Sequence, residues 1–338
     1  MGKASPGAHR MPEDDAHDRL ESLNREPLDR PPAPEPPESL RERVRKGLRR
    51  RRNAAAPTAG EAAAPGPEPL VFRRDMPRRP PPRRPIPAVG GPFVPVADAI
   101  DGQEVTAPDG QPAYVVDRPL RAAGSPWTVL CDGFLDALAS PASGLRAELV
   151  RMGVPQRVGV ADVLFLDLET AGLGSAPLFL VGAMVWEGTG LVVRQFFARD
   201  YSEEAAALEL FLALARPRTL LMSFNGKSFD LPFVRMRAAA SGVAWDWEPA
   251  HLDLLHASRR VWGPTLSDCR LQTLERVLCG RLRDDDIPGH LIPDAYHEFV
   301  RTGNAVRMAS VLEHNFLDLV TLADLLTRLP AGTPVSDE

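Results

Sequence analysis

Residues 163–170, Val-Leu-Phe-Leu-Asp-Leu-Glu-Thr, place two carboxylates at the end of an apolar run. An apolar run of this length predicts a buried strand. Side chains two positions apart on a strand point to the same side, so Asp167 and Glu169 project together. Adjacent carboxylates raise each other's pKa, and Mg²⁺ or Mn²⁺ bound by both relieves that repulsion. The pair therefore suggests a metal site, although a strand ending in a solvated polar loop explains such a motif more often when it stands alone.

The first part of the chain differs in composition from the rest. Residues 1–92 are rich in Pro, Ala, Arg and Glu and poor in apolar residues, which predicts a disordered tail. Two Arg-rich stretches, 49–52 and 73–84, could contact a phosphate backbone without sequence specificity. A solvated linker with a high Arg content is the slightly preferred interpretation, so we assign no specific role to this tail.

The composition excludes several classes of protein. Three cysteines are too few and too scattered for a disulfide framework or a zinc ribbon, and they suit a reducing compartment. The chain has no apolar run of membrane-spanning length, and its first residues lack the apolar core of a secretory signal. We therefore expect a cytoplasmic protein without a membrane partner, and the sequence identifies no protein partner.

Residues 93–160 are expected to form a small N-terminal extension that packs on a larger domain. Short strands are predicted at 104–106 and 113–116, on either side of the turn Pro108-Asp109-Gly110, and a helix is predicted to start near Phe134.

Residues 161–330 have the element pattern of an α/β domain. A Gly-containing turn between the second and third predicted strands favours antiparallel pairing. The expected elements are strands at 163–168, 178–186 and 191–197, a helix at 202–215, a strand at 219–224, a helix at 230–240, a strand at 252–254 and further helices up to 329. This is the element order of a ribonuclease H-like (RNase H-like) fold. We expect a mixed five-stranded sheet flanked by helices.

A third acidic residue follows the fourth predicted strand. Residues 223–230, Ser-Phe-Asn-Gly-Lys-Ser-Phe-Asp, place Asp230 at the start of a helix, beside the end of that strand. Sites in α/β sheets lie just beyond the carboxyl ends of strands. Asn225 and Gly226 suit a tight turn, and Lys227 could meet a phosphate. Taken alone, Asp230 is more readily explained as the cap of its helix.

The last predicted helix carries His314 and Asp318. The two residues are four positions apart, so they share one face of the helix. Asp318 lies close to the edge of the apolar stripe, where a carboxylate is costly unless it is paired or bound to a metal. Taken alone, a His–Asp pair of this kind is more often structural than functional.

Together the three segments resemble the three motifs of the DEDD exonucleases, Asp-x-Glu, Asn-x-x-x-Phe-Asp and His-x-x-x-Asp. A closer resemblance is to the YprB-like RNase H-domain family. It rests on residues 251–262 (His-Leu-Asp-Leu-Leu-His-Ala-Ser-Arg-Arg-Val-Trp), on 285–289 (Asp-Asp-Ile-Pro-Gly) and on His314-Asn315-x-x-Asp318. The chain is therefore identified as resembling this family over about residues 163–329.

The resemblance implies a metal-dependent nuclease, in its simplest form a 3′–5′ exonuclease that acts on the single-stranded 3′ end of DNA or RNA. The implied ligands of two Mg²⁺ or Mn²⁺ ions are Asp167, Glu169, Asp230 and Asp318. The implied base is His314, and the implied substrate contacts are Thr170, Asn225 and Lys227. The alternative is a non-catalytic nucleic-acid-binding module with the same fold, but the presence of all four acids argues against it.

The third motif departs from the two types of this superfamily. The histidine type leaves four residues between its His and its Asp, and the tyrosine type leaves three; here His314 has the spacing of the tyrosine type. One residue fewer turns a side chain on a helix by about 100°. The role of His314 as a base is therefore less secure than the four carboxylates. The resemblance also draws attention to Asp286, which lies in an acidic run otherwise expected to be a solvated loop.

Overall fold

The computed structural model describes residues 92–122, 125–154, 158–283 and 286–331. The predicted disordered tail lies outside these residues except for Pro92. Among the helices of the described ranges, none has both the length and the apolar character that a membrane span needs.

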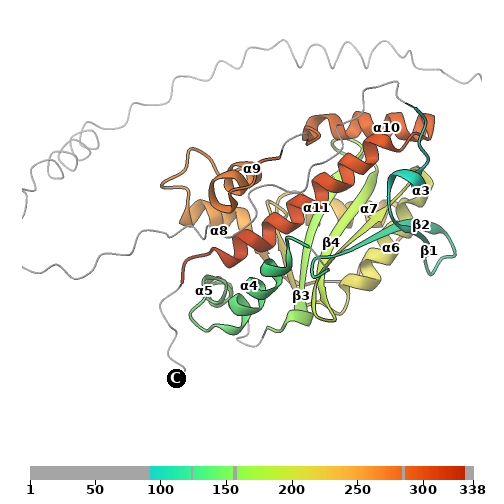
Figure 1. Ribbon diagram of the computed structural model, residues 1–338. Helices are drawn as coiled ribbons and strands as arrows, with labels where there is room; N and C mark the ends of the chain where they lie inside the picture. The colour runs from blue at the N-terminus through green and yellow to red at the C-terminus, as the bar shows by residue number, and fades with distance from the viewer. Residues whose placement is uncertain (1–91, 123–124, 155–157, 284–285, 332–338) are drawn as a thin grey trace, which may run out of the picture. The chain divides into compact units, whose positions relative to one another are not determined.

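A mixed sheet of seven strands is the centre of the fold (Figure 1). The strands are β1 (Gln103–Thr106), β2 (Pro112–Pro119), β3 (Val163–Thr170), β4 (Leu178–Glu187), β5 (Gly190–Phe197), β6 (Leu220–Ser223) and β7 (Ala250–Asp253). Their order across the sheet is β1-β2-β5-β4-β3-β6-β7. The strands from β1 to β3 pair antiparallel, whereas β3–β6 and β6–β7 are parallel. The expected RNase H-like α/β class is confirmed.

The expected number of five strands is wrong, because the β1–β2 hairpin extends the sheet. β2 pairs with β5 from Tyr114 opposite Phe197 to Pro119 opposite Val192. The edge of β5 has backbone groups that need hydrogen-bond partners, and β2 supplies them. The segment predicted as an extension packed on the domain therefore provides two strands of the same sheet. The domain division between residues 160 and 161 itself stays a prediction.

Helices cover both faces of the sheet (Figure 1). They are α3 (Val96–Ala99), α4 (Thr128–Ala139), α5 (Gly144–Arg151), α6 (Glu204–Ala215), α7 (Asp230–Ala240), α8 (Leu254–Val261), α9 (Leu271–Leu274), α10 (Ile292–Thr302) and α11 (Val306–Thr327). Between α9 and α10 lies a π-helix over Glu275–Cys279. α6 and α7 contact the sheet from one side, and α11 crosses the other side together with α4.

The alternation of side chains along β3 divides it between two hydrophobic cores. Leu164, Leu166 and Leu168 pack in the core that contains the buried residues of α6 and α7. Val163 and Phe165 pack in the other core, which contains the buried residues of α4 and of the C-terminal half of α11. Burying one such side chain contributes about 1.5–3 kcal/mol. Because side chains alternate along a strand, the next residues on the α11 side are the two acids of the opening motif, at positions 167 and 169.

Candidate active site

Four carboxylates from three elements meet beside the C-terminal end of β3. Asp167 and Glu169 are half-buried on the side of β3 that faces α11. Asp230 is the buried first residue of α7, and Asp318 lies just past the middle of α11, with 16% of its side chain exposed. The four acids lie close enough for their charges to act on one another, whereas their role as a shared site stays a prediction.

These carboxylates repel each other. Burial raises the pKa of the Asp167 carboxyl well above its usual range, and the charges of the other three acids raise it further. Glu169 has a pKa raised in the same way, by burial first and then by its acidic neighbours. Burial is also the largest cause that raises the pKa of Asp230 to about 7. The cluster is therefore short of positive charge.

Asp230 is held in place beside the part of β3 that no longer pairs with β6. Only Val163–Phe165 of β3 pair with β6, so the later residues of β3 have no β6 partner. The backbone of Leu168 hydrogen-bonds to the Asp230 carboxylate instead. The carboxylate also lies near Gly226, where an added Cβ would come within 3.1 Å of Asp230 Oδ2. The loop and the helix start that carry the second motif are thus held tightly against β3.

Asp167 is fixed by a buried amide on α11. Asn315 Nδ2 donates to Asp167 Oδ2 at 2.8 Å and to the Asp167 carbonyl at 3.2 Å. Gln195 on β5 donates in turn to Asn315 Oδ1 at 2.8 Å, and both amide side chains are fully buried. Gly182, opposite Asp167 on β4, leaves the space that the Asn315 amide fills. Asn315 and Gln195 were not predicted as site residues from the sequence. The available signal was a polar residue within an apolar stripe.

Arg283 brings one positive charge into the cluster. Its Nη2 pairs with Asp318, its Nη1 lies 3.2 Å from Asp286 Oδ2, and its Nε lies 2.5 Å from Glu275 Oε2. Burial would lower the pKa of the guanidinium, but the charges of these three carboxylates raise it. Arg283 therefore stays protonated and holds Asp318 in place. Arg283 was not predicted as a site residue, because its partner Asp318 lies 35 residues further along the chain.

The polar network continues away from the acids, along α11. Arg281, which is 3% exposed, donates to Glu275 Oε1 at 3.1 Å and to Thr321 Oγ1 at 2.9 Å, and it pairs with Asp324. Thr321 donates to the same Glu275 oxygen at 2.9 Å. Removing one partner of such a buried ion pair typically costs about 3–5 kcal/mol, because the other charge is left uncompensated. The network therefore ties the π-helix to α11.

His314 lies between two carboxylates. Its Nδ1 is 3.0 Å from both oxygens of Asp286, and its Nε2 is 3.6 Å from Asp318 Oδ2. Burial would lower the pKa of the imidazole, but the hydrogen bond to Asp286 and the two negative charges raise it. The same hydrogen bond helps to lower the pKa of Asp286 against the effect of burial. Asp286, expected in a solvated loop, is therefore part of the site.

The donor set fits a divalent cation. Carboxylates are the hard oxygen ligands that Mg²⁺ and Mn²⁺ prefer, and their mutual repulsion favours a cation among them. Within residues 92–331, undescribed gaps excepted, no three His, Cys, Asp or Glu side chains already form a ready metal-binding arrangement. Asp318 and Asp167 are instead occupied by Arg283 and Asn315. The four metal ligands therefore stay a prediction.

The predicted substrate contacts lie beside the acids. Asn225 and Lys227 are exposed in the loop after β6, and Asn225 has a left-handed backbone with φ of 64°. Asp253, at the end of β7, accepts hydrogen bonds from their backbone N–H groups at 2.8 Å and 3.1 Å. Thr170 turns inward and donates from Oγ1 to the carbonyl of Gly172 at 2.8 Å. The roles of these residues in binding remain predictions.

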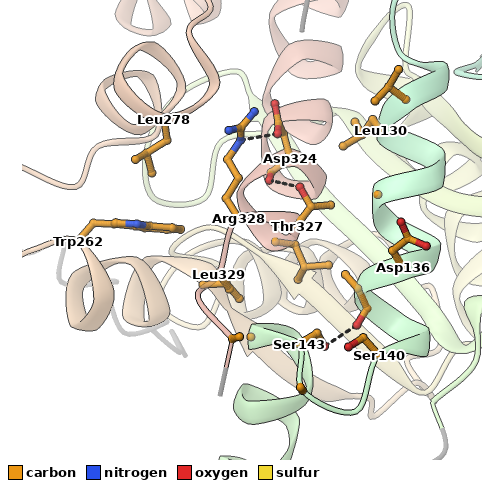
Figure 2. Close-up of a pocket in the computed structure, with 17 residues that line it drawn as sticks. Leu130, Asp136, Ser140, Ser143, Trp262, Leu278, Asp324, Thr327, Arg328 and Leu329 are labelled. Atoms are coloured by element: carbon orange, nitrogen blue, oxygen red, sulfur yellow. Dashed lines mark hydrogen bonds and ion pairs between the residues drawn. The ribbon is translucent and has the colours of Figure 1, made fainter. Parts of the chain in front are cut away.

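A hollow of about 450 Å³ lies elsewhere, between α4 and the C-terminal end of α11 (Figure 2). Its lining includes Trp262, Leu278 and the Asp324–Arg328 ion pair at 2.7 Å. None of the predicted site residues lines it. The acids and this hollow are therefore separate features.

Comparison with known proteins identifies the domain that carries the acids. The RNase_H_2 model of the RNase_H superfamily matches residues 164–330. The "Uncharacterized protein YprB" of Bacillus subtilis (strain 168) is 34% identical over 170 residues, which cover 48% of this chain and 41% of that protein. The chain thus spans less than half the length of this relative. Among solved structures, the family B DNA polymerase of the hyperthermophilic archaeon Pyrobaculum calidifontis matches with a TM-score of 0.39 and 16% identity, over 49% of this chain and 24% of the polymerase.

Proposed function

Because residues 164–330 form a YprB-like domain of the RNase H-fold family, we propose that the chain is a metal-dependent nuclease that hydrolyses phosphodiester bonds. The observation that carries this proposal is the meeting of four mutually repelling carboxylates beside the end of β3. We further propose 3′–5′ exonuclease action on single-stranded DNA or RNA, which rests on the resemblance of the three motifs to DEDD exonucleases.

The four carboxylates would hold two Mg²⁺ or Mn²⁺ ions. The implied ligands are Asp167, Glu169, Asp230 and Asp318. When bound, the ions would screen the scissile phosphate, lower the pKa of the attacking water and stabilise the leaving 3′ oxygen. Asn315 keeps Asp167 turned toward the site through its 2.8 Å hydrogen bond. Arg283 does the same for Asp318, which would otherwise be free to rotate on the surface of α11.

His314 would take the proton of the attacking water. Its Nδ1 is occupied by Asp286, so Nε2, on the Asp318 side, is the nitrogen that can accept a proton. Lys227 is the only lysine in the described ranges, and its exposed ammonium would meet a substrate phosphate. Asn225, in the same loop, would contact the last nucleotide.

A second candidate function is a non-catalytic nucleic-acid-binding module. One observation favours it, because Arg283 already pairs with Asp318 and would compete with a metal for that carboxylate. Such a module would bind single strands through Lys227 without cleaving them.

The test compares cleavage of 5′-labelled single-stranded DNA and RNA by the purified chain in Mn²⁺ and in EDTA. We expect shortening from the 3′ end in Mn²⁺ only, and a loss of at least about 100-fold in Asp167→Asn, since even residues that support a metal site cost 10–100-fold. Asp294→Asn is the matched control, because Asp294 is exposed in the first turn of α10 and takes no part in the contacts of the acids described above. Binding without cleavage would establish the module instead, and cleavage that persists in Asp167→Asn would refute the assigned site.

A further inference from the structure

The contacts of His314 account for both nitrogens of its ring. Nδ1 is 3.0 Å from each oxygen of Asp286, and Nε2 faces Asp318 Oδ2 at 3.6 Å. The side chain is 9% exposed, so both nitrogens lie mainly among protein atoms. A carboxylate can only accept hydrogen bonds, and a neutral imidazole has one donor nitrogen. Asp286 therefore selects Nδ1 as the nitrogen that carries the hydrogen.

Asp286 is itself held in a fixed orientation. Its side chain is 9% exposed, and Arg283 Nη1 lies 3.2 Å from its Oδ2. Arg283 cannot follow a movement of Asp286 freely, because its Nε is bound to Glu275 at 2.5 Å. Glu275 is bound in turn to Thr321 on α11 at 2.9 Å. Asp286 thus reaches His314 from a separate segment, 28 residues earlier in the chain, on a support that is anchored to the same helix.

We propose that Asp286 is a positioning residue for the nuclease: it fixes the His314 ring with Nδ1–H donated to its carboxylate and with Nε2 turned toward the four acids. This inference rests on the proposed function. It explains how a His that stands one residue closer to its Asp than in the histidine type of DEDD enzymes can still be aimed at the site. Asp286, a carboxylate from outside α11, would set the orientation of the His314 ring that the spacing along α11 alone does not give.

Two other roles for Asp286 make different predictions. If Asp286 were only a charge partner of Arg283, the ring of His314 would not respond to its replacement by Asn. If Asp286 were a metal ligand, its replacement would mainly weaken metal binding, with little effect on the tautomer of the His314 ring. The Asn variant separates these roles, because Arg283 needs an oxygen where Asp286 Oδ2 now lies. The amide nitrogen would then face His314 and donate to Nδ1, which moves the ring hydrogen to Nε2.

The first measurement is the tautomer of His314 in the metal-free protein, by ¹H–¹⁵N NMR of the imidazole nitrogens. It is made at a pH at which the same spectra show a neutral ring, because the hydrogen bond to Asp286 and the two negative charges raise the pKa of His314 above the ordinary value of imidazole. His314→Gln identifies its signal among the seven histidines. We expect a protonated Nδ1 in the parent chain and a protonated Nε2 in Asp286→Asn. A bare Nδ1 in the parent, or an unchanged tautomer in the variant, would overturn the proposal.

The second measurement separates positioning from metal binding and from the proposed function. In Asp286→Asn we expect kcat on a single-stranded substrate to fall about 10–100-fold, KM to change less than about threefold, and Mn²⁺ affinity by calorimetry to stay within about threefold. Asp286→Glu, which keeps an acceptor, should recover part of kcat. A large loss of Mn²⁺ affinity would overturn the proposal in favour of a metal ligand. A parent chain that cleaves no nucleic acid would refute the nuclease function, whereas the NMR result would still decide the Asp286–His314 contact.

Discussion

Asp230 is a buried acid whose surroundings disfavour its charged form. It is 6% exposed, and burial together with acidic neighbours raises the pKa of its carboxyl to about 7. The Asp230 carboxyl therefore ionises less readily in the folded protein than in the unfolded chain, so its ionisation lowers the free energy of unfolding. Under the proposed function, a cation bound to the carboxylate would offset this cost.

Asp230→Asn should stabilise the metal-free protein. In EDTA at pH 8 the variant loses a buried charge but keeps an oxygen that can accept the hydrogen bond from Leu168. We expect a gain of about 2 kcal/mol, or several degrees in Tm. If the proposed metal site exists, Mn²⁺ should raise the Tm of the parent chain, and the variant should lose that increase. Calorimetric or fluorescence melting of both proteins, with Asp294→Asn as the control, measures this. A lower Tm of Asp230→Asn in EDTA would contradict the argument.

His251 lowers stability as the pH falls, whereas Asp230 lowers it as the pH rises. Its Nε2 lies 2.7 Å from Ser223 Oγ, and burial lowers the pKa of the ring to about 4, against a partial effect of the Asp253 charge. The unfolded chain therefore takes up this proton near pH 6.5, before the folded protein does. The contribution of His251 is full above pH 6.5 and declines as the pH falls toward 4.

His251→Gln isolates this effect, because Gln keeps a partner for Ser223 and does not titrate. Between pH 7.5 and pH 5 the parent chain should lose about 1–2 kcal/mol more of its free energy of unfolding than the variant does. Urea unfolding at the two pH values gives the four free energies needed. Equal losses in the two proteins would mean that His251 is protonated as readily in the folded state as in the unfolded one.

At the scale of elements, α11 approaches the sheet closely where β3 pairs with β4. A Cβ added to Gly182 would lie 2.1 Å from Asn315 Oδ1. The Asn315 amide cannot move aside without breaking its hydrogen bonds to Asp167 and Gln195. The distance between α11 and β4 therefore controls how the first acid is oriented.

Gly182→Ala should cost about 1–3 kcal/mol of stability and also lower Mn²⁺ affinity. Adding Asn315→Ala should recover much of the stability, since the collision disappears, but not the Mn²⁺ affinity, since Asp167 loses its donor. Gly289→Ala is the control, because no atom lies within 4 Å of a Cβ there. Denaturation and calorimetric titration of the three variants check these outcomes. If Gly182→Ala leaves both quantities unchanged, the close approach has no role.

Elements that depend on local pattern were predictable from the sequence. α7 begins at Asp230 and ends at Ala240 as expected, and β3 follows from its apolar run. The π-helix over 275–279 was not predicted, because its widened turn accompanies the ion pairs of Glu275 with two arginines that follow it. Similarly, the three acidic motifs are local, whereas the Asp286–His314 contact joins segments 28 residues apart and depends on the path of the chain between them.

At the scale of the whole molecule, the sheet includes β1 and β2, which the sequence pattern assigns to a separate N-terminal extension. The sequence predicts the β1–β2 hairpin, but hairpin patterns say nothing about which strand edge they join. In the structure β2 lies along β5, and Ala113, Tyr114, Val115 and Val116 are buried in the core that also contains α6. The hairpin therefore contributes to the folding of the domain that carries the four acids, and neither segment alone predicts this.

Two shortened chains test this dependence. A chain that starts at residue 92 keeps the hairpin, and one that starts at residue 122 lacks it. Burial of Tyr114, Val115 and Val116 contributes about 1.5–3 kcal/mol for each side chain. The combined loss is comparable to the stability of a typical domain, about 5–15 kcal/mol. The exposed edge of β5 would also be open to pairing with other chains. We expect the longer chain to unfold cooperatively and the shorter one to aggregate or to show no thermal transition, by circular dichroism and size-exclusion chromatography. A monomeric shorter chain with the same Tm would instead show that the rest of the domain folds without the hairpin.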